Sequence, residues 1–262
     1  MAQGGLGRIF KRRDAKLLAV LLTGLLAAVF PAPGQTGGQS PAEGQASAPF
    51  DMTGYWVSVI TQNWRLRMVT PPRGDYIGIP LNMEAKKVAD VWDPARDETA
   101  GNQCKGYSAA AIMTNPERLH IAWQDAATLR MDIDSGTQTR LFHFGNWRSP
   151  GGAPSWQGDS VAKWSARTAL ADPSSPQARA LKVTTTNLRP AYLRKNGVPF
   201  SAKATLTEYF DVFQEPEGDA WMIVTSVVDD PVYLDNPWIV SSQFKKETNA
   251  SGWDPTPCSS RW

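Results

Sequence analysis

Apolar and polar residues alternate along short segments that begin near residue 53 and are rich in β-branched and aromatic side chains. Alternation with a period of two is typical of half-buried β-strands. Because no regular succession of helices separates these segments, we expect one all-β domain over 50–262, folded as an antiparallel barrel of about 8–10 strands. The predicted strands are 53–60, 63–69, 118–124, 127–133, 137–144, 159–166, 180–187, 203–213, 219–228 and 238–246.

Several of the segments between these strands carry turn signals. Residues 134–136 (DSG) and 215–219 (EPEGD) place a glycine where a tight hairpin requires a positive φ, and residues 124–126 (QDA) form a third short turn. Strands joined by such turns are antiparallel. The stretch 145–158 is rich in glycine and proline, which predicts a loop long enough to cover a site.

One helix interrupts the strand pattern. It is expected over residues 83–92, with Asn82 as its N-cap and Pro94 at its end. Val88, Val91 and Trp92 fall at helical spacing, so we expect this face of the helix to lie on the face or mouth of the barrel.

The first 34 residues have the pattern of a secretory signal peptide. A basic segment at 8–16 precedes an apolar run at 17–30 and small residues at 32–34. The apolar run covers about 21 Å, less than the ~30 Å hydrocarbon core, so we expect cleavage and no stable membrane span afterwards. Sec export to the periplasm or beyond is the leading expectation, although Arg12-Arg13 leaves twin-arginine export open. Residues 35–49 predict a flexible spacer.

Removal of this leader changes the charge of the protein. The full chain has 27 basic and 25 acidic side chains, and residues 1–34 hold five of the basic and one of the acidic residues. The remaining 22 basic and 24 acidic residues move the net charge from +2 to −2. A domain of this charge has no basic footprint for nucleic acid, so no nucleic-acid partner is expected.

The two cysteines fit an exported chain. In an oxidising compartment Cys104 and Cys258 would form a disulfide, and the alternative is two buried free thiols. With two Cys and two His in no ligand spacing, no metal site is expected. Phosphate-loop and dinucleotide motifs are also absent from the sequence, so we expect no cofactor.

Three side chains are candidates for acid/base chemistry. Glu208 lies in the middle of a predicted strand, where it would point outward or pair inside with an arginine such as Arg140. His143 lies just before the long loop, and Asp230 follows a strongly apolar strand. A carboxylate of shifted pKa with His143 could serve as an acid/base pair at a barrel rim.

The eleven tryptophans, all beyond residue 50, are the unusual feature of the composition. Most should fill the core, but those in the loop could stack on a ligand at a barrel mouth. The candidate ligand-binding residues are Arg140, Tyr209, Trp147, Trp156, Trp164 and Trp238.

Five short motifs follow one another along the chain: CKGYS at 104–108, RLFHFG at 140–145, WQGDSVAKW at 156–164, LTEYF at 206–210, and DDP at 229–231 followed by PW at 237–238. As an ordered set they resemble a family of exported bacterial β-rich proteins that is loosely lipocalin-like. Residues 54–56 (GYW) are similar to the lipocalin Gly-x-Trp pattern. The resemblance implies a lipocalin-like barrel and export, but no particular reaction.

Three functions therefore stay open. The first is binding of a small apolar or aromatic molecule in a cavity of the barrel lined by Trp and Tyr. The second is a cofactor-independent lyase, isomerase or cyclase that uses Glu208 or Asp230 with His143. The third is an accessory or interaction protein of the cell envelope, which a large exposed apolar patch would favour. The sequence does not indicate an oligomeric state.

Overall fold

The structure is a computed structural model that describes residues 44–166, 179–216 and 218–261. The predicted signal peptide and most of the predicted spacer lie outside these residues. Among the described residues, no helix has both the length and the apolar composition needed to cross a bilayer.

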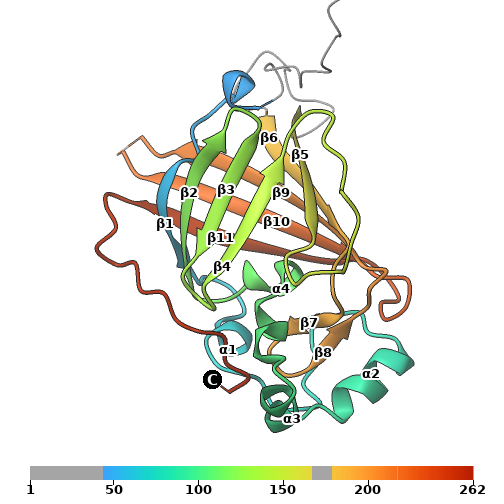
Figure 1. The fold of residues 1–262 in the computed structure, drawn as a ribbon. Coiled ribbons are helices and arrows are strands. Elements are labelled where there is room, and N and C mark those ends of the chain that lie inside the picture. The colour runs from blue at the N-terminus through green and yellow to red at the C-terminus, as the bar shows by residue number, and fades with distance from the viewer. Residues whose placement is uncertain (1–43, 167–178, 217, 262) are drawn as a thin grey trace, which may run out of the picture. The chain divides into compact units, whose positions relative to one another are not determined.

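Nine strands close into one barrel, which confirms the predicted fold class (Figure 1). Neighbouring strands pair antiparallel, except for a short parallel contact between the strands on either side of the 144–158 loop. Around the barrel the strands are β1 (Gly54–Val59), β11 (Trp238–Glu247), β10 (Ala220–Asp229), β9 (Thr205–Gln214), β6 (Arg179–Thr186), β5 (Asp159–Ala166), β4 (Gln138–His143), β3 (Thr128–Ile133) and β2 (Arg118–Asp125).

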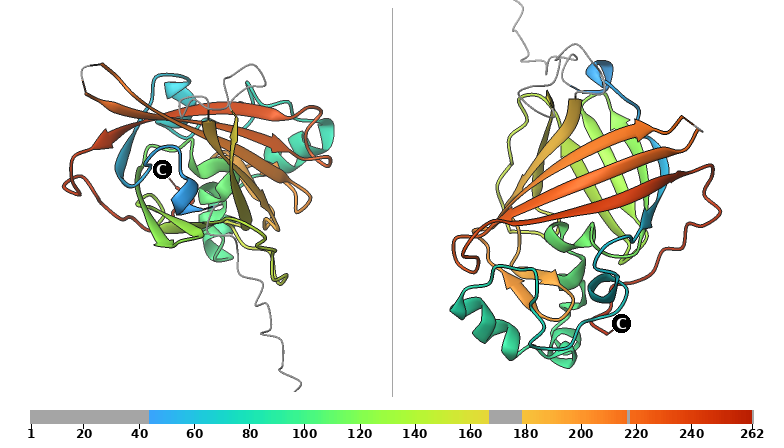
Figure 2. Two further views of the ribbon diagram at one scale, coloured as in Figure 1. Left: turned by 90° about the horizontal axis from the view of Figure 1, so that it is seen from above. Right: turned by 180° about the vertical axis from the view of Figure 1, so that it is seen from behind.

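The predicted hairpins are present. Gly136 and Gly218 have φ values of 77° and 104°, as the turns between β3 and β4 and between β9 and β10 require. The strands β9 and β10 pair over their whole length, from Thr205 opposite Asp229 to Gln214 opposite Ala220. Seen from behind, the long strands β9, β10 and β11 cross the barrel at an angle to β2, β3 and β4 (Figure 2).

The predicted strand at 63–69 is wrong. Residues 64–67 form a one-turn helix, α1 (Trp64–Arg67), because Asn63 adopts a left-handed conformation with φ of 52° and turns the chain away from the sheet. Trp64 and Met68 alternate with arginines as in a strand, yet they are 67% and 54% exposed. Alternation alone therefore misidentified a surface segment as sheet.

The predicted helix is present as α2 (Met83–Asp90), and the side chain of Asn82 accepts a hydrogen bond from the Ala85 N–H. Its buried face consists of Ala85 and Ala89. Of the predicted apolar face, Val88 and Val91 are exposed, contrary to expectation, whereas Trp92 is half-buried and packs against Gly197. The sequence pattern also missed several short elements: η2 (Gln45–Ser47), α3 (Pro94–Thr99), η3 (Gln103–Tyr107), α4 (Ala109–Ile112), β7 (Ala191–Arg194) and β8 (Val198–Phe200).

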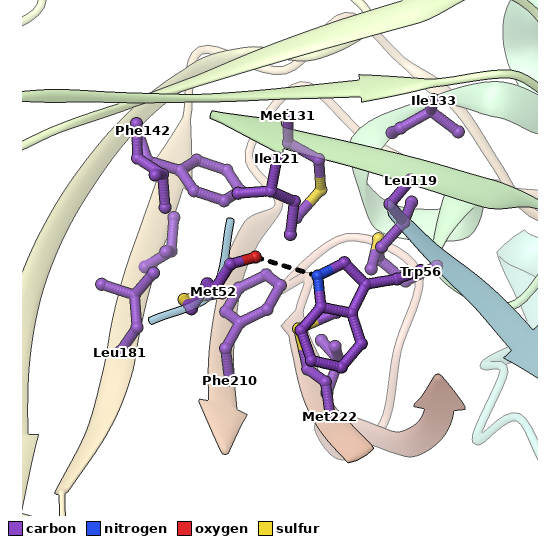
Figure 3. Packing of buried hydrophobic residues seen from close by; sticks show 14 of the residues in the cluster. Met52, Trp56, Leu119, Ile121, Met131, Ile133, Phe142, Leu181, Phe210 and Met222 are labelled. Carbon is purple, nitrogen blue, oxygen red and sulfur yellow. Dashed lines mark hydrogen bonds between the residues drawn. The ribbon is translucent and has the colours of Figure 1, made fainter. Parts of the chain in front are cut away.

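The barrel interior is packed with apolar side chains, as Figure 3 shows for part of the cluster. Trp56 is fully buried at its centre, and its indole N–H donates to the Met52 carbonyl over 2.9 Å. Each fully buried side chain of this size contributes about 1.5–3 kcal/mol. Other members of the cluster are Leu119, Ile121, Leu129, Met131, Phe142, Phe144, Leu181, Val183, Phe210, Met222, Val224 and Phe244.

Short elements cover the two ends of the barrel (Figure 1). At one end the Trp164 indole donates to the Gly44 carbonyl over 3.0 Å, just before η2. A Cβ on Gly44 would lie 2.1 Å from the Ala126 carbonyl oxygen, so only glycine allows this approach. At the other end α4 contributes Ile112 to the barrel core and its first residues to a second apolar cluster.

The second cluster lies around the two-stranded sheet of β7 and β8 and contains the buried residues Leu193, Phe200 and Trp238. The turn between these strands holds Gly197 at φ of 83°, where a Cβ would lie 2.2 Å from Trp92 Cγ. The hairpin packs directly against the indole ring, so only glycine fits at this position of the turn.

The predicted disulfide between Cys104 and Cys258 is present, with Cα atoms 5.1 Å apart. It joins η3 to the C-terminal segment across 154 positions of sequence. On a chain-entropy model, closing a loop of this length stabilises the fold by about 4–5 kcal/mol.

Candidate functional site

A groove of about 420 Å³ lies outside the barrel core, between α1 and the first residues of β11. Small-molecule sites in proteins commonly have volumes of about 300–1,000 Å³, so this groove has the size of a small ligand. We call it the lateral groove. Its walls include Trp64, Arg67, Ile77, Arg194, Trp238 and Ile239.

The apolar wall of the lateral groove is unusually open to solvent. Trp64, Ile77 and Ile239 are 67%, 63% and 63% exposed, while Trp238 is buried and belongs to the second apolar cluster. The turn at Asn63 explains the position of Trp64, because it removes α1 from the sheet and leaves the indole without a core to enter. Clustered exposed apolar side chains of this kind mark sites of binding.

Two half-buried arginines form the polar part of the groove. Arg67 donates from Nε to the Thr114 carbonyl over 2.8 Å and from Nη2 to Ser242 Oγ over 3.0 Å. Arg194 donates from Nη2 to the Ile77 carbonyl over 2.9 Å. Burial lowers the pKa of both guanidinium groups, but arginine stays charged at all ordinary pH values. The hydrogen-bond acceptors of both guanidinium groups are thus carbonyl and hydroxyl oxygen atoms, which carry no net charge.

The nearby acids leave the groove with an excess of positive charge. Asp75 pairs with Arg65 over 2.6 Å, and the hydrogen bond from Arg65 holds the pKa of Asp75 below its ordinary value. Glu117 interacts electrostatically with Arg67, but burial raises the pKa of its carboxyl well above the ordinary range. Neither carboxyl oxygen of Glu117 has a hydrogen-bond partner among the described residues. Asp75 thus offsets Arg65 and also interacts electrostatically with Arg194, whereas burial favours the uncharged form of Glu117 near Arg67, so positive charge exceeds negative charge at the groove.

Of the predicted ligand-binding residues, Trp238 lines the lateral groove and the other five do not. Arg140 lies inside the barrel, where its Nη1 donates to Glu208 Oε1 over 2.9 Å and both side chains are fully buried. Tyr209 lies on the opposite face of its sheet from Glu208, with Lys182 Nζ 5.5 Å from its ring centre. Arg140 and Tyr209 thus already contact protein side chains.

The other three predicted tryptophans make separate contacts. Trp147 stacks on the His143 ring, with ring centres 4.2 Å apart. Trp156 lies in the 144–158 loop, with the guanidinium of Arg189 4.1 Å from its ring centre. Trp164 packs edge-on against Phe50 beneath η2. The long loop thus carries aromatic side chains, but they do not converge on one cavity.

The predicted acid/base residues lie in three different parts of the molecule. Glu208 faces the barrel interior, whereas His143 follows Phe142 on β4 and lies on the opposite face of the sheet. Partial burial lowers the pKa of His143. Asp230 is buried just beyond β10, where it accepts hydrogen bonds from the Ser201 N–H and hydroxyl over 2.6 and 2.7 Å. Asp230 anchors the 201–204 turn to the end of β10.

Sequence reasoning missed Trp64, Arg67, Ile77 and Arg194. The segment WRLR at 64–67 carried a signal, because it alternates aromatic or aliphatic residues with arginines next to a proline-rich stretch. Its alternation predicts a strand, in which every second side chain would be buried, and so does not indicate that these side chains are exposed. Arg194 lies far along the chain from Arg67, and only the fold brings both into one groove.

No protein-family model matches this chain, and a search of curated proteins finds no match. Among the described residues, no group of three or more His, Cys, Asp or Glu side chains is placed to hold a metal ion.

Proposed function

We propose that this protein binds a small molecule with an apolar or aromatic body in the lateral groove. The observation that carries the proposal is a groove of about 420 Å³ walled by Trp64, Ile77 and Trp238. The residues of the barrel core do not line this groove. A ligand therefore has room beside the barrel, where the aromatic wall is accessible.

The exposed wall supports this proposal energetically. Apolar surface removed from water contributes about 25 cal/mol per Å², and Trp64 and Ile239 leave more than half of their surfaces exposed. A flat ring placed against them would cover this surface and also contact Trp238 at the base. Protein partners already contact the rings of Trp147 and Trp156, which leaves less apolar surface for a ligand to gain.

We place this binding function outside the cytoplasm. The disulfide between Cys104 and Cys258 is compatible with an oxidising compartment. The leader pattern at residues 1–34 and the resemblance to exported β-rich proteins support a periplasmic or secreted location. The ligand would then be a molecule that the protein meets in the envelope or the medium.

The test uses N-phenyl-1-naphthylamine, an uncharged aromatic probe whose fluorescence rises in an apolar site. We expect saturable binding, and we expect Trp64→Ala to weaken it about tenfold, because losing a large aromatic contact costs about 1–2 kcal/mol. The matched control is Trp147→Ala, which removes a partly buried indole elsewhere on the barrel and should leave the affinity unchanged. Equal affinities of the wild type and Trp64→Ala would reject the proposal.

A further inference from the structure

We propose that the ligand of the lateral groove is an amphipathic anion, with an acidic group bound by Arg67 and Arg194 and an apolar body against Trp64 and Trp238. This inference rests on the proposed function and adds the chemical class of the ligand. An acidic group at one end and an aromatic or aliphatic body at the other would match the two kinds of wall that the groove presents.

The hydrogen bonds of the two arginines leave donors available. Arg67 uses Nε and Nη2 for Thr114 and Ser242, and no described residue accepts from its Nη1. Arg194 uses Nη2 for Ile77 and makes a long contact of 3.5 Å from Nη1 to the Asp75 carbonyl. No described residue accepts from its Nε. Because a guanidinium fork binds carboxylate, sulfonate or phosphate oxygens in pairs, these free N–H groups suit an acidic ligand.

The charges of the surrounding residues also favour an anion. The groove holds three arginines, and Asp75 pairs with Arg65 and also interacts electrostatically with Arg194. Glu117 is the acid that acts on Arg67, and its burial favours the uncharged form. Removing a charge from water is costly unless an opposite charge compensates it. An anionic ligand would supply that compensation for Arg67 and Arg194.

Arg140 provides a comparison with the two groove arginines, because its acidic partner is supplied by the protein. Its guanidinium is fully buried and paired with the carboxylate of Glu208. Arg67 and Arg194 have only hydroxyl and carbonyl partners, and both line an accessible groove. No described carboxylate accepts a hydrogen bond from either of these two residues, and we assign that role to the acidic group of the ligand.

Two probes with the same ring skeleton separate this inference from the proposed function. 8-Anilinonaphthalene-1-sulfonate carries a sulfonate that N-phenyl-1-naphthylamine lacks. We expect the wild type to bind the sulfonate about tenfold more tightly, because a hydrogen bond to a charged group contributes about 1.5–3 kcal/mol. Arg194→Gln and Arg67→Gln should each remove most of this preference, so that the affinities for the two probes become similar.

Arg130→Gln is the matched control, because it removes one positive charge from β3, outside the groove. Thermal unfolding followed by circular dichroism checks that each variant is folded. If Arg67→Gln does not fold, Arg194→Gln and the salt dependence of binding still test the inference. Raising NaCl from about 20 mM to about 500 mM should weaken sulfonate binding and leave binding of the uncharged probe unaffected.

Competition then identifies the acidic group. 1-Naphthoate and 1-naphthyl phosphate should displace the fluorescent sulfonate better than uncharged 1-naphthalenemethanol, and the stronger competitor defines the preferred acid. Equal affinities for the sulfonate and the uncharged probe, or a preference that survives both arginine variants, would overturn the inference. The proposed function fails separately, if binding of the uncharged probe does not depend on Trp64.

Discussion

The barrel interior and the lateral groove both contain arginine and tryptophan side chains, but these side chains differ in burial and in hydrogen-bond partners. Inside the barrel, Trp56 is fully buried with its N–H bonded to a carbonyl, and Arg140 is paired with Glu208. In the groove, Trp64 is 67% exposed and Arg67 binds only neutral oxygens. Residue type therefore does not show which aromatic and cationic side chains are available to a ligand.

This difference assigns separate tasks to the two regions. The interior side chains hold the barrel together, because their apolar surfaces are buried and both Nη atoms of Arg140 donate to Glu208, although its Nε has no hydrogen-bond partner among the described residues. In the groove, Trp238 belongs to the second apolar cluster, but Trp64 and Ile239 keep apolar surface exposed and Arg67 and Arg194 keep donors unused. Substitutions should therefore change stability in the interior and binding in the groove, which can be measured separately.

The largest expected effect comes from breaking the interior ion pair. Glu208→Ala leaves the Arg140 guanidinium buried without its carboxylate, so we expect the free energy of unfolding to fall by about 3–5 kcal/mol. Urea denaturation followed by circular dichroism measures this loss. Asp132→Ala is the control, because Asp132 pairs with a partly exposed Arg130 and its removal should cost about 1 kcal/mol or less. Similar losses for both variants would contradict the assigned role of the interior pair.

A second prediction concerns Glu117, the buried carboxyl near the groove. Burial raises its pKa well above the ordinary value of 4.5, so the folded protein keeps a proton that the unfolded chain releases. Its contribution to stability is full below pH 4.5 and is lost as the pH rises, by at most about 1.4 kcal/mol per pH unit. We expect Glu117→Gln to remove this slope between about pH 4.5 and 7.

Lys195 sets the upper limit of that window, because burial lowers the pKa of its ammonium group to about 7. In the wild type the lysine is protonated in both states below this pH and adds no slope, whereas above it the folded protein loses the proton first and stability rises with pH. Because Glu117 raises the pKa of Lys195, Glu117→Gln should lower it further, so stability of the variant should start to rise at a lower pH. Melting temperatures of the wild type and Glu117→Gln at pH 5, 6 and 7 test the prediction. Parallel pH profiles would contradict it.

The smallest expected change in stability is at the groove. Trp64→Ala and Arg194→Gln should alter the free energy of unfolding by about 0.5 kcal/mol and about 1 kcal/mol at most, because Trp64 is largely exposed and Arg194 loses one good hydrogen bond. The same denaturation experiment measures both. A loss of several kcal/mol from Trp64→Ala would show that the apolar wall is part of the core.

The features that could be predicted from sequence are those encoded locally. Strand alternation, the hairpin glycines at 136 and 218, and the Asn82 cap depend on neighbouring residues, and the structure confirms them. The segment 64–67 was predicted wrongly, because the left-handed residue that precedes it overrides the alternation. Short elements such as β7 and β8 carry too few residues to show a period.

The groove could not be predicted, because its two arginines come from segments that the barrel topology brings together. Arg67 follows β1, while Arg194 ends β7, the first strand of the β7–β8 hairpin. The predicted aromatic cavity placed Trp147 and Trp164 together, although they make separate contacts on the barrel. Which tryptophans stay exposed depends on packing partners that are distant in sequence.

The most direct test of the account is a crystal structure of the wild-type protein with bound 8-anilinonaphthalene-1-sulfonate. We predict ring density between Trp64 and Trp238, with the sulfonate oxygens within hydrogen-bonding distance of Arg67 and Arg194. Density for the probe inside the barrel, or against Trp147 and Trp156 with an empty lateral groove, would contradict the central claim.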